Sequence, residues 1–78
     1  MTVTERVQRI IDNIILRKST TEDLDKTWDE LHIDSLDLVE VLRDIEDEFV
    51  ITLEYSIFKD NKILTVADLI NYLSKQQP

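Results

Sequence analysis

The sequence predicts an all-α fold, a small bundle of three main helices plus one short helix. Its 78 residues are enough for one domain with one modest core. Glycine is absent and the single proline is the last residue, so polar capping residues must set the turns. Three segments place apolar residues at helical spacing directly after such a cap, and these segments define the main helices.

The first helix is expected to open at Thr2, because Glu5 follows three residues later in a capping-box pattern. Its apolar stripe consists of Val3, Val7, Ile10, Ile11 and Ile14. From Arg17 to Ile33 the helical pattern lapses into polar residues with isolated apolar ones. This stretch is interpreted as a long connection.

The second helix is expected from about Ser35 to Phe49, with Asp34 as its cap and Asp37 in its first turn. One face carries the core stripe of Leu38, Val41, Leu42, Ile45 and Phe49. A short helix is predicted around Tyr55 to Lys59. Thr65 is expected to cap the last helix, whose apolar side holds Val66, Leu69, Ile70 and Leu73.

The opposite face of the second helix has the features of a docking surface. Leu36 and Val39 project away from the predicted core and are surrounded by carboxylates. Like-charged residues four apart, such as Glu40 and Asp44, each cost about 0.2–0.5 kcal/mol, so the charge must serve another purpose or form a plain solvated face. The predicted docking residues are Asp34, Leu36, Asp37, Val39, Glu40, Arg43, Asp44, Glu46 and Asp47.

Ser35 lies at the start of this helix, and no residue nearby in the sequence is suited to activate it as a catalytic nucleophile. The chain has no cysteine, and its only histidine, His32, has no adjacent carboxylate to orient the ring. An exposed serine of this kind is an attachment point rather than a nucleophile, and the protein is not expected to be an enzyme. No metal site is expected either. A calcium-binding loop requires glycine at a fixed position, and Trp28 occupies that position in the one stretch that resembles such a loop.

The net charge of −8 repels nucleic acid and anionic lipid, so neither is an expected partner. A partner protein with a basic patch suits this charge better. No apolar run is long enough to span a membrane, and the N-terminus lacks the layout of a secretory signal. Together with the absence of cysteine, these features predict a cytoplasmic protein.

The chain resembles the acyl carrier proteins. The resemblance rests on D-S-L at the head of a helix, its continuation through V-E to E-D-E-F, and the segments T-W-D-E-L-H-I-D-S-L, F-V-I-T-L and T-V-A-D-L-I-N-Y-L. It covers most of the chain. It implies one domain over residues 1–78, folded as a helical bundle of the acyl-carrier type.

The resemblance also implies a function. A phosphopantetheinyl transferase would move 4′-phosphopantetheine from coenzyme A onto Ser35, with Asp34 helping to position the transferase or its divalent cation. The thiol of the arm would then carry acyl thioesters for fatty-acid, polyketide or related synthesis. The partners implied are this transferase and the acyl-transfer and synthase enzymes with basic docking patches. The chain is expected to act as a free-standing monomer.

Two alternatives stay open. A peptidyl or aminoacyl carrier is one, although such carriers more often place histidine directly before the serine, where this chain has Asp34. The other is a carrier-like interaction module that never receives the arm. The chain departs from the family at His32, where glycine is usual, and at Arg43, where an apolar residue is common. Tyr55, Ile57 and Phe58 are candidates to line a cavity for the acyl chain.

Overall fold

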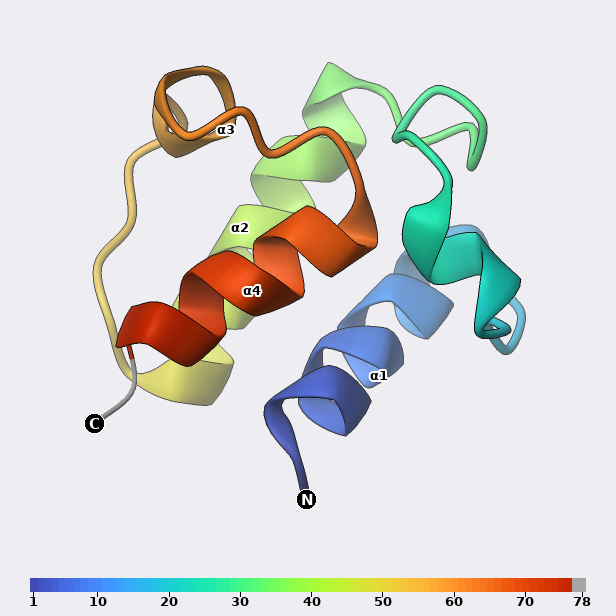
Figure 1. Ribbon diagram of the computed structural model, residues 1–78, viewed down its shortest axis with the longest axis horizontal. Coiled ribbons are helices and arrows are strands. Elements are labelled where there is room, and N and C mark those ends of the chain that lie inside the picture. The colour runs from blue at the N-terminus through green and yellow to red at the C-terminus, as the bar shows by residue number, and fades with distance from the viewer. Residues whose placement is uncertain (77–78) are drawn as a thin grey trace.

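The computed structural model describes residues 1–76, and these form a helical bundle that confirms the predicted fold class (Figure 1). Helix α1 (Val3–Ile15) packs against both α2 (Ser35–Phe49) and α4 (Val66–Gln76), and α4 also contacts the 3₁₀ turn η1 (Glu22–Asp25). In Figure 1 the short helix α3 (Ile57–Asp60) lies at the top. The elements are α1 (Val3–Ile15), η1 (Glu22–Asp25), α2 (Ser35–Phe49), α3 (Ile57–Asp60) and α4 (Val66–Gln76).

The caps predicted at Thr2, Asp34 and Thr65 begin the main helices, and each forms a reciprocal capping box. At α1 the hydroxyl of Thr2 accepts from the Glu5 N–H at 3.1 Å, and the Glu5 carboxylate accepts from the Thr2 N–H at 3.1 Å. The Thr2 N–H and, at 3.0 Å, the Thr2 hydroxyl both donate to the Glu5 carboxylate, and these two hydrogen bonds hold the pKa of Glu5 below its usual value. Ahead of α4, Thr65 and Asp68 exchange the same pair of hydrogen bonds at 3.1 and 3.2 Å.

The chain makes its sharp turns with left-handed residues other than glycine. Leu16 and Val50 end α1 and α2 at φ values of 62° and 53°, and His32 and Lys62 adopt 59° and 51° in the connections. A Cβ disfavours this conformation, and branching at Val50 makes it worse. The left-handed backbone at His32 explains why glycine suits that position.

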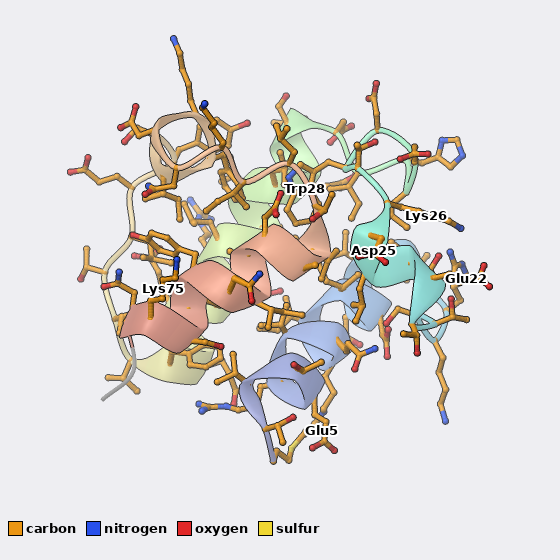
Figure 2. All side chains as sticks on the ribbon, viewed as in Figure 1. Glu5, Glu22, Asp25, Lys26, Trp28 and Lys75 are labelled. Carbon is orange, nitrogen blue, oxygen red and sulfur yellow. The ribbon has the colours of Figure 1, made fainter. Side chains whose placement is uncertain are left out.

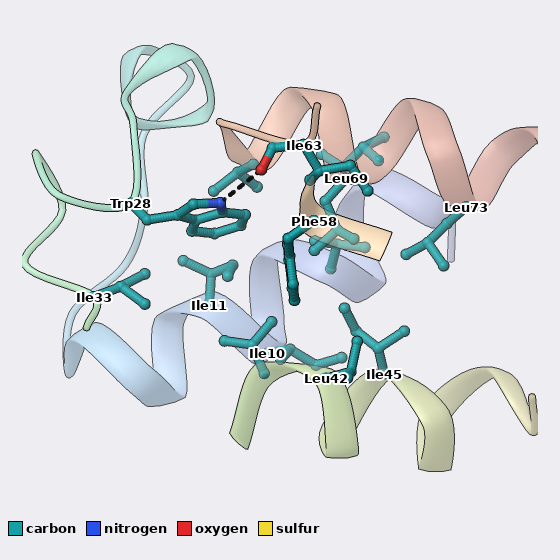
Figure 3. Packing of buried hydrophobic residues seen from close by; sticks show 14 of the residues in the cluster. Ile10, Ile11, Trp28, Ile33, Leu42, Ile45, Phe58, Ile63, Leu69 and Leu73 are labelled. Carbon is teal, nitrogen blue, oxygen red and sulfur yellow. Dashed lines mark hydrogen bonds between the residues drawn. The ribbon is translucent and has the colours of Figure 1, made fainter. Parts of the chain in front are cut away.

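The core lies where the three main helices meet, and Trp28 closes it from the side of the α1–α2 connection. Its indole N–H donates to the Ile63 carbonyl at 3.1 Å, and its ring meets Phe58 edge-on with centroids 5.9 Å apart (Figure 3). The buried apolar residues are Val7, Ile10, Ile11, Trp28, Leu31, Ile33, Val41, Leu42, Ile45, Phe49, Ile57, Phe58, Ile63, Val66, Leu69, Ile70 and Leu73.

The short helix begins later than predicted, at Ile57 instead of Tyr55. Tyr55 and Ser56 belong to a preceding turn, in which the Ile57 N–H donates to the Glu54 carbonyl at 3.1 Å. Because that turn uses i→i+3 hydrogen bonds, the helical apolar pattern alone does not separate it from α3.

The α1–α2 connection contains a feature that the sequence pattern did not indicate, the turn η1 around a buried carboxylate. Asp23 is 2% exposed and accepts hydrogen bonds from Arg17 at 2.7 Å, from the Thr20 N–H at 2.8 Å and from Lys26 at 3.0 Å. The guanidinium of Arg17 is the main reason that the pKa of Asp23 lies far below its usual range. Other charged side chains, such as Glu5 and Glu22, lie at the periphery (Figure 2).

Candidate functional site

Ser35 is the first residue of α2, and its side chain is exposed. The helix begins there because Asp34 and Asp37 form a capping box. The Asp34 carboxylate accepts from the Asp37 N–H at 2.8 Å, and the Asp37 carboxylate accepts from the Asp34 N–H at 3.3 Å. The predicted cap is confirmed, and it fixes the serine at the exposed end of a 15-residue helix.

The turn before the serine is fixed by its backbone. The His32 N–H donates to the Asp29 carbonyl at 3.0 Å, and the Ile33 N–H donates to the Trp28 carbonyl at 2.9 Å. With His32 left-handed, Ile33 turns into the core while the histidine side chain stays exposed. The buried Ile33 therefore anchors the approach to Ser35.

A cleft of about 490 Å³ opens directly beside Ser35. Its walls are mainly apolar and come from three parts of the chain, which a β-bridge between Thr27 and Thr65 helps to hold together. The lining residues are Thr27, Trp28, Asp29, Ile33, Asp34, Ser35, Leu38 and Leu64.

The residues expected to line a cavity for the acyl chain are not part of this cleft. Tyr55, Ile57 and Phe58 do not line it; the last two are buried in the core and Tyr55 is 44% exposed. Sequence reasoning missed Leu64 as a wall residue. The signal for it was an apolar residue just before the Thr65 cap, outside the core stripe of α4.

The outward face of α2 has the predicted orientation. The Leu36 side chain is 79% exposed and Val39 is 38% exposed, whereas Val41 and Ile45 are fully buried. Of the other predicted docking residues, those that are exposed are Asp34, Glu40, Arg43 and Asp47, and those that are half-buried are Asp37, Asp44 and Glu46.

Some of these acidic side chains already accept hydrogen bonds within the fold. Asp34 and Asp37 cap the helix, and the Glu46 carboxylate accepts from the Leu53 N–H at 3.0 Å. The segment after α2 is thereby held against the helix, where Arg43, Glu46 and Asp47 border a second hollow of about 470 Å³. The structure therefore places the predicted docking residues along one helix with a hollow at each end.

The C-terminal end of α2 is clamped to α1. The Arg6 guanidinium donates to the Glu48 carboxylate at 2.8 Å and to the Glu48 carbonyl at 2.7 Å. It also lies 4.0 Å from the centroid of the Phe49 ring. Arg6 thus fixes one end of α2, while the end that bears Ser35 stays open to the surroundings.

The position of Ser35 suits a covalently attached phosphodiester. The first N–H groups of an α-helix have no intrahelical acceptor, and the helix dipole favours negative charge there. The carboxylates of Asp34 and Asp37 lie next to this position and are engaged in the capping box. The adjoining cleft offers apolar walls to the uncharged part of a long arm.

Within residues 1–76, neither a metal-binding group of histidine and acidic side chains nor a helix able to cross a membrane is present. The site therefore combines an exposed serine at a helix start with an apolar cleft on an acidic helical bundle.

Comparison with known proteins gives the family. Residues 5–73 match the family described as "Phosphopantetheine attachment site". The chain is 40% identical over 76 residues to the acyl carrier protein of Streptococcus pneumoniae serotype 4, with 97% of both chains covered. It is 35% identical over 77 residues to the acyl carrier protein of Lactococcus lactis subsp. cremoris, covering 99% of this chain and 100% of the relative. No solved structure matches the chain.

The chain therefore belongs to the acyl carrier protein family. Its members are non-catalytic carriers, and membership implies a covalently attached 4′-phosphopantetheine. Membership also implies recognition by a phosphopantetheinyl transferase and by synthase or acyl-transfer enzymes.

Proposed function

We propose that Ser35 is the attachment point of the 4′-phosphopantetheine arm, and that residues 1–78 form a single, monomeric carrier domain acting in the cytoplasm. In the loading step the serine oxygen bonds to the phosphorus of the pantetheine phosphate. The bond from that phosphorus to the adenosine bisphosphate of coenzyme A breaks, and the hydroxyl proton passes to the transferase. When bound, the arm supplies a thiol that holds acyl groups as thioesters for fatty-acid, polyketide or related synthesis.

The observation that carries this proposal is the exposed Ser35 hydroxyl at the start of α2, beside an apolar cleft of about 490 Å³. The hydroxyl is accessible to an incoming enzyme, and the helix start favours the anionic linkage that forms on it. Asp34 keeps its place next to the serine through the capping box, so it can present its second carboxylate oxygen to a transferase or to that enzyme's divalent cation.

Docking is assigned to the outward face of α2. Leu36 and Val39 supply apolar contact close to the serine, and exposed carboxylates such as Glu40 and Asp47 surround them. An apolar anchor inside a charged rim concentrates binding energy, while the rim speeds association with a basic patch. Arg43 adds a positive charge to this face, so cognate enzymes should differ from those that require an apolar residue at that position.

The second candidate is a carrier-like interaction module that never receives the arm. The same outward face of α2 favours it, because docking through Leu36 needs no cofactor. The presence of both Asp34 and Ser35 favours the loaded carrier. A peptidyl or aminoacyl cargo remains an alternative for the loaded protein.

The test is intact mass after incubation with coenzyme A, Mg²⁺ and a broad-specificity phosphopantetheinyl transferase. Wild type should gain one arm, and Ser35→Ala should gain none while melting at nearly the same temperature. The control is Ser56→Ala, which removes another exposed hydroxyl and should load like wild type. An arm on Ser35→Ala refutes the site, and an unmodified wild type with several transferases favours the interaction module.

A further inference from the structure

Leu64 is an exposed leucine that the fold holds rigidly beside the serine. Its side chain is 61% exposed and lines the same cleft as Ser35. The Leu64 N–H donates to the Asp68 carboxylate at 3.0 Å, which ties the residue to the first turn of α4. The bridge between Thr27 and Thr65 fixes the next residue against the opposite wall. Leu64 therefore stays in place while its side chain faces solvent.

Ser35 consequently lies between two exposed leucines from different parts of the chain. Leu36 follows it on α2, and Leu64 borders the cleft from the turn before α4. Exposing a large apolar side chain next to an apolar cleft gives nothing to the folded monomer, and it is typical of a contact that a partner covers.

The charge around the two leucines differs. The outward side of α2 is strongly acidic, and Asp29 and Asp34 line the cleft that Leu64 borders. The exposed charges that precede Leu64 in the chain are Lys59, Asp60 and Lys62, which are mixed in sign. A basic patch that matches α2 therefore meets a weaker negative charge on the side of residues 59–62. The surface around Leu64 fits an apolar pocket on the partner.

An enzyme that forms a bond to the Ser35 oxygen must bring its own atoms into van der Waals contact with that hydroxyl. Ser35 and Leu64 line the same cleft, so this enzyme approaches the rim of the cleft as well. We propose, on the basis of the function proposed above, that the phosphopantetheinyl transferase binds astride Ser35, with a basic patch on α2 and an apolar pocket that receives Leu64. Recognition then depends on the turn before α4 as well as on α2.

The experiment measures kcat/KM for arm transfer from coenzyme A by a broad-specificity transferase, at low and moderate salt, with wild type and variants. Leu64→Ala and the similarly sized Leu64→Gln should each lower kcat/KM about tenfold, as loss of an apolar anchor does. Leu64→Met should stay near wild type. The matched control is Leu16→Ala, since Leu16 is 86% exposed at the end of α1 and outside the proposed surface.

Salt dependence distinguishes the two halves of the surface. Leu64→Ala should leave the salt dependence of kcat/KM unchanged, whereas Glu40→Lys should lower kcat/KM and weaken that dependence. Melting curves identify any variant that fails to fold, in which case Leu64→Gln decides. Rates within twofold of wild type for both Leu64→Ala and Leu64→Gln overturn the inference while loading of wild type still supports the carrier. A wild type that is never loaded refutes the carrier itself.

Discussion

The protein uses carboxylates in opposite ways in the α1–α2 connection and on α2. Asp23 is buried and fully engaged by Arg17, Lys26 and the Thr20 N–H. On α2, Glu40 and Asp47 are exposed and face solvent. The same residue type therefore holds the fold together in one region and presents charge to the outside in the other. The net charge of the protein does not distinguish these two roles. The hydrogen-bond donors around each carboxylate do.

The largest loss of stability is expected from a substitution at Asp23. Asp23→Asn removes the charge from a buried site and leaves Arg17 and Lys26 facing a neutral amide, so the melting temperature should fall by on the order of 10 °C. Asp25→Asn is the control, because Asp25 is exposed in the same turn and should melt within a few degrees of wild type. Equal melting of the two variants, followed by circular dichroism, would show that burial of Asp23 contributes little.

Acid should narrow this difference in melting temperature. The folded-state pKa of Asp23 is depressed by Arg17, so its contribution to stability is complete above the unfolded-state pKa of about 4 and declines as the pH falls further. The gap in melting temperature between wild type and Asp23→Asn should narrow from pH 6 toward roughly pH 2–3. A gap that persists unchanged over this range would mean that the asparagine variant fails for steric reasons.

Removing a charge from the acidic face of α2 should stabilise the protein, whereas removing the charge of Asp23 should destabilise it. Glu40 and Asp44 repel each other at four-residue spacing, and Arg6 already compensates Glu48. Asp44→Asn should therefore stabilise the protein by about 0.2–0.5 kcal/mol at low salt. Added salt or a few millimolar Mg²⁺ should raise the melting temperature of wild type more than that of the variant. Thermal melts at two ionic strengths are sufficient, and a destabilised variant would show that Asp44 has a favourable partner.

The smallest effect on stability is expected at Leu36. Because its side chain is 79% exposed, Leu36→Ala should change the free energy of unfolding by less than about 0.5 kcal/mol. It should nevertheless weaken binding to a transferase or cognate synthase, measured by titration calorimetry beside the melting curves. A strongly destabilised variant would place Leu36 in the core, and unchanged affinity would move the docking surface away from this end of α2.

Local rules predicted much of the fold. The caps at Thr2, Asp34 and Thr65 and the burial of one face of α2 follow from side-chain chemistry within a few residues. Helical spacing alone also places Leu36 outward. These features do not depend on contacts between distant parts of the chain.

Non-local contacts account for what the sequence did not reveal. The Asp23 cluster needs Arg17 from six residues upstream to fold back in an irregular turn. The cleft wall at Leu64 depends on a bridge between the α1–α2 connection and the start of α4. Tyr55, Ile57 and Phe58 do not line the cleft beside Ser35, because Ile57 and Phe58 are buried in the core and Tyr55 lies in a surface turn. Their place beside an acyl chain stays a prediction.

Trp28 can also serve as an intrinsic fluorescent probe. It is the only tryptophan in the chain, it borders the cleft beside the serine, and its indole N–H is bound to the Ile63 carbonyl. Indole emission therefore arises from a single site and is sensitive to both the polarity of the cleft and the integrity of the core. Loading, cargo exchange and unfolding can be followed in real time on the unlabelled protein.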